Sequence, residues 1–328
     1  MNTIAISTRN YGQLELISTT ATELASTRAG RLDQTIYARW LAFMDKKEKT
    51  RQTYERAIRQ FSAWLSERGI YRPERQDILD YKRYLDESKH KPATINLYLV
   101  AVNRFFKWAE LEGLYENPYK EIDKVKEDMT PKKDYLTIDQ IKDLLLTIDR
   151  STLQGLRDYA ILRLMLTSGL RTIEVSRANI EDKQKRGNTH GIYIQGKGCA
   201  SKCQWIPLAP MVEKAISEYL AKRNETDKHA PLFVSMSNNS KGYRLAAGSI
   251  STLAKRAMKK IGLDDEKHTA HSCRHTAITQ YLLAGHTPQE AQAIARHKHL
   301  DTTMLYAHNL DITKDTCVSD LDNAIGEL

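Results

Sequence analysis

The chain has 328 residues, more than a single hydrophobic core usually organises, so two folded units are expected. Lysine and arginine number 50 against 41 aspartates and glutamates, and the net charge of +9 favours nucleic acid as a partner over an anionic membrane surface. No apolar run reaches the roughly 20 residues of a membrane helix, and four scattered cysteines exclude a disulfide scaffold. Without a signal-peptide pattern at the amino terminus, these features predict a cytoplasmic protein with no membrane contact.

Residues 1–32 are rich in Ser, Thr and Ala, which predicts a mobile arm to which we assign no function. Apolar side chains from Tyr54 to Leu65 recur at helical spacing and predict a helix over 49–67 that Gly69 ends. Further amphipathic stretches follow, so we predict a small helical domain over 33–118. Aromatic residues on these apolar stripes are assigned to the core: Tyr54, Phe61, Phe105, Phe106 and Trp108.

Residues 119–134 are highly charged and show no apolar face to bury, so we interpret them as a linker. The segment from Thr137 to Gln140 matches a capping box that starts a helix and opens a second domain over 135–310. Its periodicity predicts helices at 157–168, 211–223 and 249–261, and two short strands at 191–195 and 204–208. The predicted fold class is mainly α with a small β-sheet in the second domain.

Chemistry-bearing residues gather toward the carboxyl terminus. Seven of the ten histidines lie within residues 268–308, a density that indicates a use for imidazole there. His271 and Arg274 are three residues apart, so on a helix they share one face and can reach one anion. A second cluster places His297 nine residues before Tyr306. These patterns predict an anion-binding site with a tyrosine nearby.

Upstream, an apolar helix ends in Thr167-Ser-Gly-Leu-Arg171 with Glu174 three residues further on, and Gly196-Lys197-Gly198 lies between the two predicted strands. Together with the two clusters, these elements resemble the tyrosine recombinase (phage integrase) family over about residues 33–308. The resemblance implies a helical, SAM-like core-binding domain and a catalytic domain that clamp duplex DNA from opposite sides. It also implies six active-site positions: Arg171, Lys197, His271, Arg274, His297 and Tyr306.

The implied reaction is cleavage and rejoining of DNA strands through a 3′-phosphotyrosyl intermediate. A covalent ester keeps the phosphodiester energy, so neither an energy cofactor nor a metal is needed. The phenol of Tyr306 must lose its proton as it attacks, since its ordinary pKa is about 10. Two guanidiniums, those of Arg171 and Arg274, can grip the phosphate oxygens with paired hydrogen bonds and supply the charge that a metal supplies elsewhere.

The remaining family positions suit proton transfer. His271 and His297 can donate to the phosphate oxygens or help move the tyrosine proton, and the sequence does not choose between them. Lys197 on its Gly-flanked turn is assigned to protonate the departing 5′ oxygen. Glu174, one turn from Arg171, is assigned a supporting, orienting role.

Three departures from the family pattern stand out. Arg296 replaces the usual glycine before the second-cluster histidine, and the absence of glycine predicts an altered turn geometry. Cys273 replaces the usual leucine of the first cluster. The lysine-bearing loop is also longer than usual, which makes Lys202 a rival of Lys197 for the acid role. None of these departures removes a reacting group.

Other residues have competing interpretations. Zinc ligation by a set of histidines and cysteines is a minor alternative, opposed by the charge of Arg274 within it: His271, His275, Cys273, Cys199 and Cys203. Four histidines of the cluster are interpreted as structural or DNA-facing: His268, His275, His299 and His308. A basic group before and within the 49–67 helix is either a solvated face or a set of phosphate contacts, which we favour: Lys46, Lys47, Lys49, Arg51, Arg56 and Arg59.

The expected partner is double-stranded DNA with paired half-sites, bound by a homotetramer that forms on DNA from monomers, with an accessory DNA-bending protein as a further candidate. Residues 311–328 carry an amphipathic pattern and predict a tail helix that contacts a neighbouring protomer, or alternatively folds back on its own domain. Competing functions are a type IB topoisomerase, a telomere resolvase and a catalytically silent DNA-binding regulator. The amino-terminal arm favours a mobile element over chromosome resolution.

Overall fold

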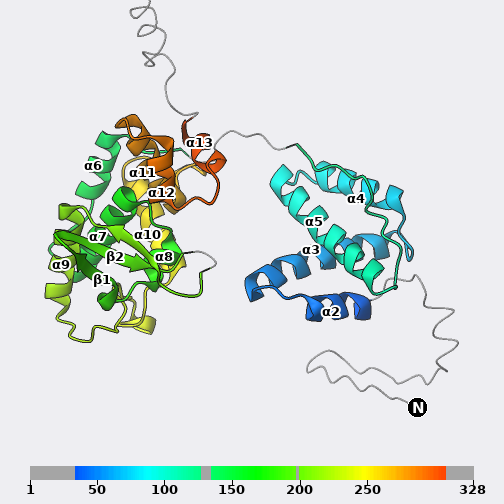
Figure 1. Cartoon of the computed structure of the whole chain (residues 1–328), viewed down its shortest axis with the longest axis horizontal. Coiled ribbons are helices and arrows are strands. Elements are labelled where there is room, and N and C mark those ends of the chain that lie inside the picture. Colours follow the sequence, from blue (N-terminus) through cyan, green and yellow to red (C-terminus); the bar gives the residue numbers. More distant parts are fainter. Residues whose placement is uncertain (1–33, 127–133, 197–198, 308–328) are drawn as a thin grey trace, which may run out of the picture. The chain divides into compact units, whose positions relative to one another are not determined.

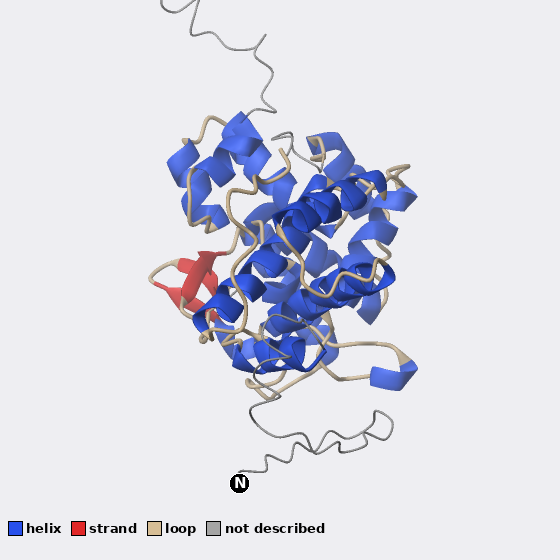
Figure 2. Ribbon diagram, turned by 90° about the vertical axis from the view of Figure 1, so that its right-hand side faces the viewer, coloured by secondary structure: helices blue, strands red, loops and turns tan. Residues whose placement is uncertain are grey.

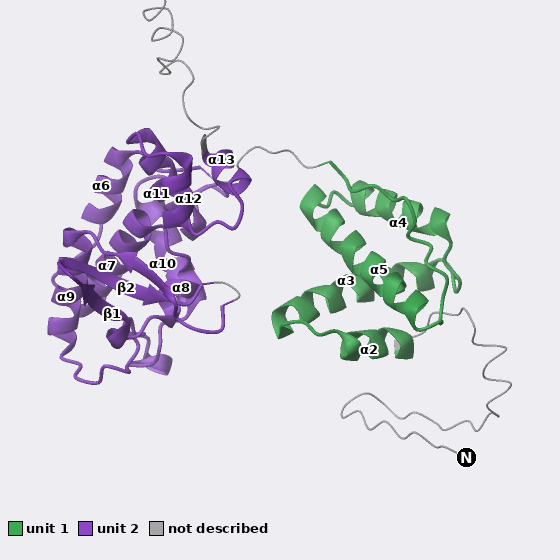
Figure 3. Ribbon diagram, in the orientation of Figure 1, with its two compact units in different colours: residues 1–128 green, residues 129–328 purple. Residues whose placement is uncertain are grey.

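The computed structural model describes residues 34–126, 134–196 and 199–307. The chain forms two compact units, Met1–Asp128 and Met129–Leu328, which Figure 3 shows in different colours. The predicted arm, the predicted tail helix and Lys197 lie outside the described residues. None of the helices within the described ranges is long and apolar enough to cross a membrane.

Unit 1 is built of helices, among them α2 (Gln34–Phe43), α3 (Glu48–Glu67), α4 (Arg75–Glu87) and α5 (Pro92–Leu111). Helix α5 packs against the other three (Figure 1). Aromatic rings fill the space between them because the apolar stripe of each helix faces inward. The aromatic residues assigned to the core from their spacing are all buried, which confirms that prediction: Tyr54, Phe61, Phe105, Phe106 and Trp108.

Helix α3 separates apolar from basic side chains. Tyr54, Ile58 and Phe61 are buried on one side, whereas Arg56 and Arg59 are exposed. The helix ends as predicted, because Gly69 follows it with a φ of +66°, a left-handed conformation that glycine adopts without a steric penalty.

Residues 119–126, which the charge pattern places in the linker, pack onto unit 1. Tyr119 is buried, and Ile122 and Val125 lie against the same core. The amide of Asn96 donates to the backbone oxygen of Val125 at 2.9 Å and accepts from its backbone nitrogen at 2.8 Å. This packing corrects the expectation that the segment has no apolar face to bury. Isolated apolar residues in an irregular segment leave no periodic pattern to read.

Unit 2 surrounds the long helix α7 (Leu153–Ser168), which is buried on nearly all sides and packs against α9 and α11. Its other helices are α6 (Ile138–Leu146), α8 (Thr172–Arg177), α9 (Pro210–Arg223), α10 (Ala247–Lys260), α11 (Ala270–Leu283), α12 (Pro288–Ala295) and α13 (Asp301–Ala307), with short 3-10 turns η1 (Ile180–Asp182) and η2 (Asn238–Ser240). The capping box predicted at Thr137 is present, with Gln140 as its partner.

A three-stranded antiparallel sheet lies in unit 2, in the order β1 (Lys183–Arg186), β2 (Thr189–Ile194) and β3 (Gln204–Pro207). Figure 2 shows its strands in red. Helices therefore dominate and the sheet is small, which confirms the predicted fold class. The second and third strands match the predicted ones to within two residues at each end. Strand β1 was not predicted because its sequence, Lys-Gln-Lys-Arg, lacks the alternation of apolar and polar residues that marks a half-buried strand.

Candidate active site

The turn between α7 and α8 presents Arg171. Gly169 takes a φ of +59° and ends α7, so the chain reverses and Arg171 becomes the residue that precedes α8. Glu174, one turn into α8, is fully buried and accepts hydrogen bonds from the backbone nitrogen of Arg171 at 2.8 Å and from its Nη1 at 2.9 Å. The side chain of Arg171 remains 29% exposed, so its guanidinium is oriented by Glu174 and still open to a ligand.

Arg274 lies in the middle of α11 and is 1% exposed. Its Nη1 donates to the backbone oxygen of Gly169 at 2.7 Å, and its Nη2 donates to the backbone oxygen of Ala295 at the end of α12. Burial lowers the pKa of its guanidinium to about 10, and the neighbouring charge of Arg171 acts in the same direction. The group is therefore charged at neutral pH and fixed by two separate segments of backbone.

Tyr306 lies on α13 and is 7% exposed. Its ring contacts two imidazoles: His275, with ring centroids 4.4 Å apart, and His297, with centroids 5.8 Å apart. Burial raises the pKa of the phenol, while the charges of Arg274 and Arg171 oppose that rise. The phenol is thus neutral at rest and lies in the field of two cations that stabilise its ionised form.

His297 follows the end of α12, and its Nδ1 lies 2.9 Å from the hydroxyl of Thr303 on α13. Burial, together with the charges of Arg274 and Arg171, lowers the pKa of the imidazole to about 4. Near neutral pH the ring is therefore uncharged, with Thr303 fixing its orientation. An uncharged imidazole beside Tyr306 is able to accept a proton.

His271 lies in the first turn of α11 and is exposed. Its charge contributes to the lowered pKa values of His275 and His297, so it belongs to the same electrostatic neighbourhood. Four other family positions therefore share a contact or an electrostatic neighbourhood with Tyr306 or with the imidazoles that pack on it, in the part of the chain that the structure describes: Arg171, His271, Arg274 and His297. Lys197 lies outside that part.

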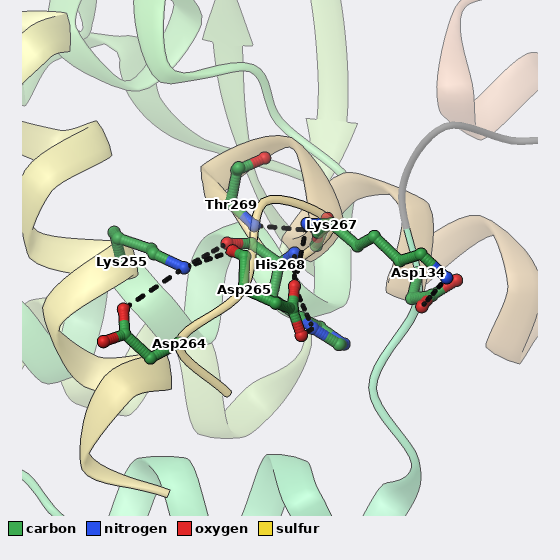
Figure 4. A network of polar contacts seen from close by, with 8 residues as sticks. Asp134, Lys255, Asp264, Asp265, Lys267, His268 and Thr269 are labelled. Carbon is green, nitrogen blue, oxygen red and sulfur yellow. Dashed lines mark hydrogen bonds and ion pairs between the residues drawn. The ribbon is translucent and has the colours of Figure 1, made fainter. Parts of the chain in front are cut away.

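The segment before α11 is fixed by a network of polar contacts (Figure 4). Asp265 accepts from the backbone nitrogen of His268 at 2.8 Å and lies 2.8 Å from its Nδ1, and this partner lowers the pKa of the carboxyl to about 2. Lys255 on α10 donates to the backbone oxygen of His268 at 3.1 Å. Lys267 forms an ion pair with Asp134 at 3.6 Å. These contacts fix the start of the helix that carries the first histidine cluster.

Lys202, the rival acid, has a partner in the fold. Its Nζ lies 2.5 Å from Oδ2 of Asp182, a buried carboxylate in the turn before β1. An ammonium that neutralises a buried carboxylate is not available to protonate a ligand elsewhere, because leaving that carboxylate unpaired is strongly unfavourable. This contact favours Lys197 as the acid.

Sequence reasoning missed three residues of the site. His275 was interpreted as structural or DNA-facing, yet it packs directly on Tyr306. Arg296 was noted as a departure from the family pattern, yet its side chain is buried and paired with Glu174 at 2.9 Å. Thr303 was not among the predicted site residues, yet its hydroxyl lies 2.9 Å from Nδ1 of His297. The one signal in the sequence was Arg296 itself, since a long side chain at a position that usually holds glycine indicates that the side chain makes a stabilising contact.

The zinc alternative receives no support from the arrangement of its candidate ligands. Cys273 is fully buried, and burial raises the pKa of its thiol to about 12, which disfavours the thiolate that a metal requires. Cys203, by contrast, is exposed. Across residues 34–126, 134–196 and 199–307, no group of three or more His, Cys, Asp or Glu side chains is placed to hold a metal ion.

The fold is that of site-specific recombinases of known structure. The XerH site-specific recombinase, solved bound to a palindromic difH substrate, superposes with a TM-score of 0.68 at 20% identity over 93% of this chain and 92% of its own. The Tn1549 transposon integrase, solved with transposon right end DNA, gives a TM-score of 0.68 at 21% identity over 89% of this chain and 99% of its own.

Residues 134–312 match the Phage integrase family, and residues 37–114 match the phage integrase N-terminal SAM-like domain. The chain therefore belongs to the phage integrase family. A tyrosine recombinase of Synechococcus elongatus is 28% identical over 58% of this chain and 59% of its own length. XerC of Caldanaerobacter subterraneus is 34% identical over 53% of this chain and 47% of its own. The chain spans about half the length of the curated relatives it matches.

Proposed function

We propose that the protein is a site-specific DNA recombinase that cleaves and rejoins DNA strands, with Tyr306 as the nucleophile. The observation that carries this proposal is the position of Tyr306, a buried phenol in contact with His275 and His297 and in the field of Arg171 and Arg274. Membership of the phage integrase family supports the same reaction class.

In the proposed reaction, Arg171 and Arg274 bind the scissile phosphate. Negative charge gathers on its non-bridging oxygens as the phosphorus becomes five-coordinate, and fixed cationic donors stabilise that charge without reorganising. Glu174 orients Arg171, and backbone oxygens of two segments orient Arg274. The site is therefore preorganised before DNA arrives, which lowers the barrier most effectively.

The proposed cleavage step forms one bond to phosphorus and breaks another. The phenolic oxygen of Tyr306 bonds to phosphorus while the bond from phosphorus to the 5′ oxygen breaks, leaving a 3′-phosphotyrosyl ester and a 5′ hydroxyl. The phenolic proton passes to a neighbouring imidazole, for which His297 and His271 both remain candidates. Attack by the 5′ hydroxyl of another strand reverses these steps and rejoins the DNA. Because each ester replaces another, no energy cofactor enters the cycle.

The departing 5′ oxygen needs a proton, and we assign Lys197 to supply it. The pairing of Lys202 with Asp182 supports this choice over its rival. A lysine is suited to general acid catalysis because its ammonium carries a transferable proton and, unlike an arginine, changes pKa readily.

We further propose that the exposed side of α3 contacts the DNA backbone. Lys49, Arg56 and Arg59 lie on the side of the helix opposite its buried apolar stripe. Arg59 also pairs with Glu55 and Arg51 with Glu48, and such exposed pairs contribute little energy, so phosphate can replace them. The full set of proposed phosphate contacts is Lys46, Lys47, Lys49, Arg51, Arg56 and Arg59.

The proposed substrate is double-stranded DNA with two half-sites, and exchange between two duplexes needs four protomers. We therefore propose a homotetramer that assembles on DNA from monomers in the cytoplasm, with the tail over 311–328 as the contact between protomers and with an accessory DNA-bending protein as an optional partner. The solved XerH and Tn1549 proteins were both determined with DNA, which supports a DNA partner here. Truncation after Leu310 should reduce cooperative binding to paired half-sites and spare binding to one.

A nicked-duplex experiment tests the proposal. Duplexes that the protein binds are selected from a randomised pool, and nicks are then placed at successive positions so that the released 5′ end diffuses away after cleavage. A covalent adduct that survives SDS and disappears on proteolysis is the expected result. Binding without any adduct would favour a silent DNA-binding regulator. Relaxation of supercoils without strand exchange between two sites would favour a topoisomerase, and closed hairpin ends would favour a telomere resolvase.

A further inference from the structure

Arg296 occupies a backbone position that suits glycine. It ends α12 with a φ of +58° and a ψ of 44°, in the left-handed region. A residue with a Cβ atom is strained there, and a long side chain gains nothing from the turn itself. Its side chain must therefore provide an interaction that offsets the strain.

The side chain of Arg296 is 7% exposed and points into the site. Its Nη2 lies 2.9 Å from Oε2 of Glu174 and donates to the backbone oxygen of Gly169 at 3.3 Å, while Nη1 donates to the backbone oxygen of Ile294 at 2.5 Å. The bond to Glu174 joins residues 122 positions apart in the sequence. The guanidinium thus connects the end of α12 to the turn before α8.

Glu174 is fully buried and lies between two guanidiniums. Arg171 donates from Nη1 to one carboxylate oxygen, and Arg296 donates from Nη2 to the other. If a buried carboxylate had a single cationic partner, the charge of that partner would be used entirely to neutralise it. With Arg296 present, a second cation bonds the carboxylate oxygen that the Arg171 guanidinium does not bond, so Glu174 attracts the guanidinium of Arg171 less strongly and leaves its charge available for a ligand.

The carbonyl of Gly169 adds a second link, because it accepts from both Arg274 and Arg296. Counting formal charges, three guanidiniums less one carboxylate leave two net positive charges in the cluster of Arg171, Arg274, Arg296 and Glu174. An excess of this sign suits a phosphate that becomes more negative during the reaction.

We propose that Arg296 is a positioning residue: it fixes the carboxylate of Glu174, and through it the guanidinium of Arg171, in the geometry that binds the scissile phosphate. This role rests on the proposed recombinase function. Arg296 itself does not contact the reacting atoms. At a turn position that suits glycine, Arg296 instead contributes an ion pair with Glu174 across the site.

The test compares Arg296→Gly, Arg296→Lys and a matched control, Asn224→Gly. Asn224 ends α9 with a φ of +54° and is exposed, so the control removes the same backbone strain away from the site. We expect Arg296→Gly to slow adduct formation at saturating protein by about 10- to 100-fold with DNA affinity unchanged. Arg296→Lys should recover part of the rate, and Asn224→Gly should match the wild type.

A double-variant cycle separates positioning from simple damage to the fold. In a Glu174→Gln background, Arg296→Gly should slow the reaction by less than about threefold, because the two residues act through one contact. Losses that multiply, or an unchanged rate in Arg296→Gly alone, would overturn the proposal. A wild-type protein that forms no adduct would instead count against the proposed function.

A measurement without DNA tests whether Arg296 positions Arg171 even if the protein forms no adduct. In full-length protein labelled with 15N-arginine, the guanidinium signal of Arg171 is assigned from its loss in Arg171→Lys. We expect Arg296→Gly to shift this signal and speed its exchange with water, while Asn224→Gly leaves it unchanged. An Arg171 signal that is the same in all three proteins would show that Arg296 does not position Arg171.

Discussion

The rings of His275 and Tyr306 lie 4.4 Å apart at an interplanar angle of 61°, an edge-to-face contact inside unit 2. Among the residues that the structure describes, none is a hydrogen-bond partner of the Nε2 atom of His275, and Nδ1 lies 3.3 Å from the hydroxyl of Thr279. The imidazole therefore acts on Tyr306 mainly as a flat, buried surface.

This contact predicts different outcomes for two substitutions of His275. Phenylalanine keeps the ring and removes an unpartnered polar atom, so His275→Phe should preserve adduct formation and the unfolding temperature of unit 2. His275→Ala leaves a cavity beside Tyr306 and should destabilise the unit by about 2 kcal/mol or more and slow the reaction. Calorimetry and the nicked-duplex assay measure both effects. Equal activity of the two variants would mean that the ring does not position Tyr306.

Tyr306→Phe should bind DNA normally and form no adduct, because only the attacking oxygen is lost while the aromatic body remains. Tyr281 is the matched control, since it is a half-buried tyrosine of the same unit whose hydroxyl donates to the backbone oxygen of Thr167. Tyr281→Phe should keep the adduct. If the adduct survives in Tyr306→Phe and disappears in Tyr281→Phe, the nucleophile is Tyr281.

Arg274→Lys should be nearly as damaging as Arg274→Ala. A lysine ammonium cannot bond the backbone oxygens of Gly169 and Ala295 together and still present two donors to a phosphate. Loss of such a donor lowers rates by about 10²- to 10³-fold in comparable oxyanion sites. Single-turnover cleavage rates at saturating protein measure the effect. Wild-type rates in the lysine variant would disprove the bidentate role.

Stability should fall as the pH decreases below about 6.5. Burial lowers the pKa of both His275 and His297 from 6.5 to about 4, so between these values the unfolded chain binds protons that the folded chain does not. The stabilisation from these groups is present above pH 6.5 and is lost as the pH falls toward 4. Calorimetric scans across this range should show the decrease for unit 2, and His275→Phe should reduce it. A flat profile would contradict the buried, neutral state of the rings.

Lys197→Ala should slow cleavage of normal DNA but not of DNA whose bridging 5′ oxygen is replaced by sulfur, because a thiolate leaves without protonation. Lys202→Ala serves as the comparison, since its partner is Asp182. That variant should lose stability and show no selective recovery with the sulfur substrate. Recovery in Lys202→Ala alone would transfer the acid role to Lys202.

Local patterns predicted the helix that precedes Arg171 and the spacing of the site residues, but they did not predict α11, α12 and α13 as elements. Arg171 and Glu174, or His271 and Arg274, share a turn of helix, so their proximity follows from the spacing alone. The contacts of Arg296 with Glu174 and of Arg274 with Gly169 cross more than 100 positions, and no periodicity carries such information. The same limit explains why His275 was not placed against Tyr306.

The burial of Arg274 beside the charges of Arg171 and Arg296 also bears on how such a chain changes over generations. Burial and these like charges lower its pKa, which means that the folded state disfavours the charged group that the reaction needs. Apolar replacements at buried ionic positions often raise heat tolerance. Selection for thermal stability and selection for strand cleavage therefore act in opposite directions at Arg274. In lineages where selection no longer maintains strand cleavage, we expect these arginines to be lost before the apolar core residues.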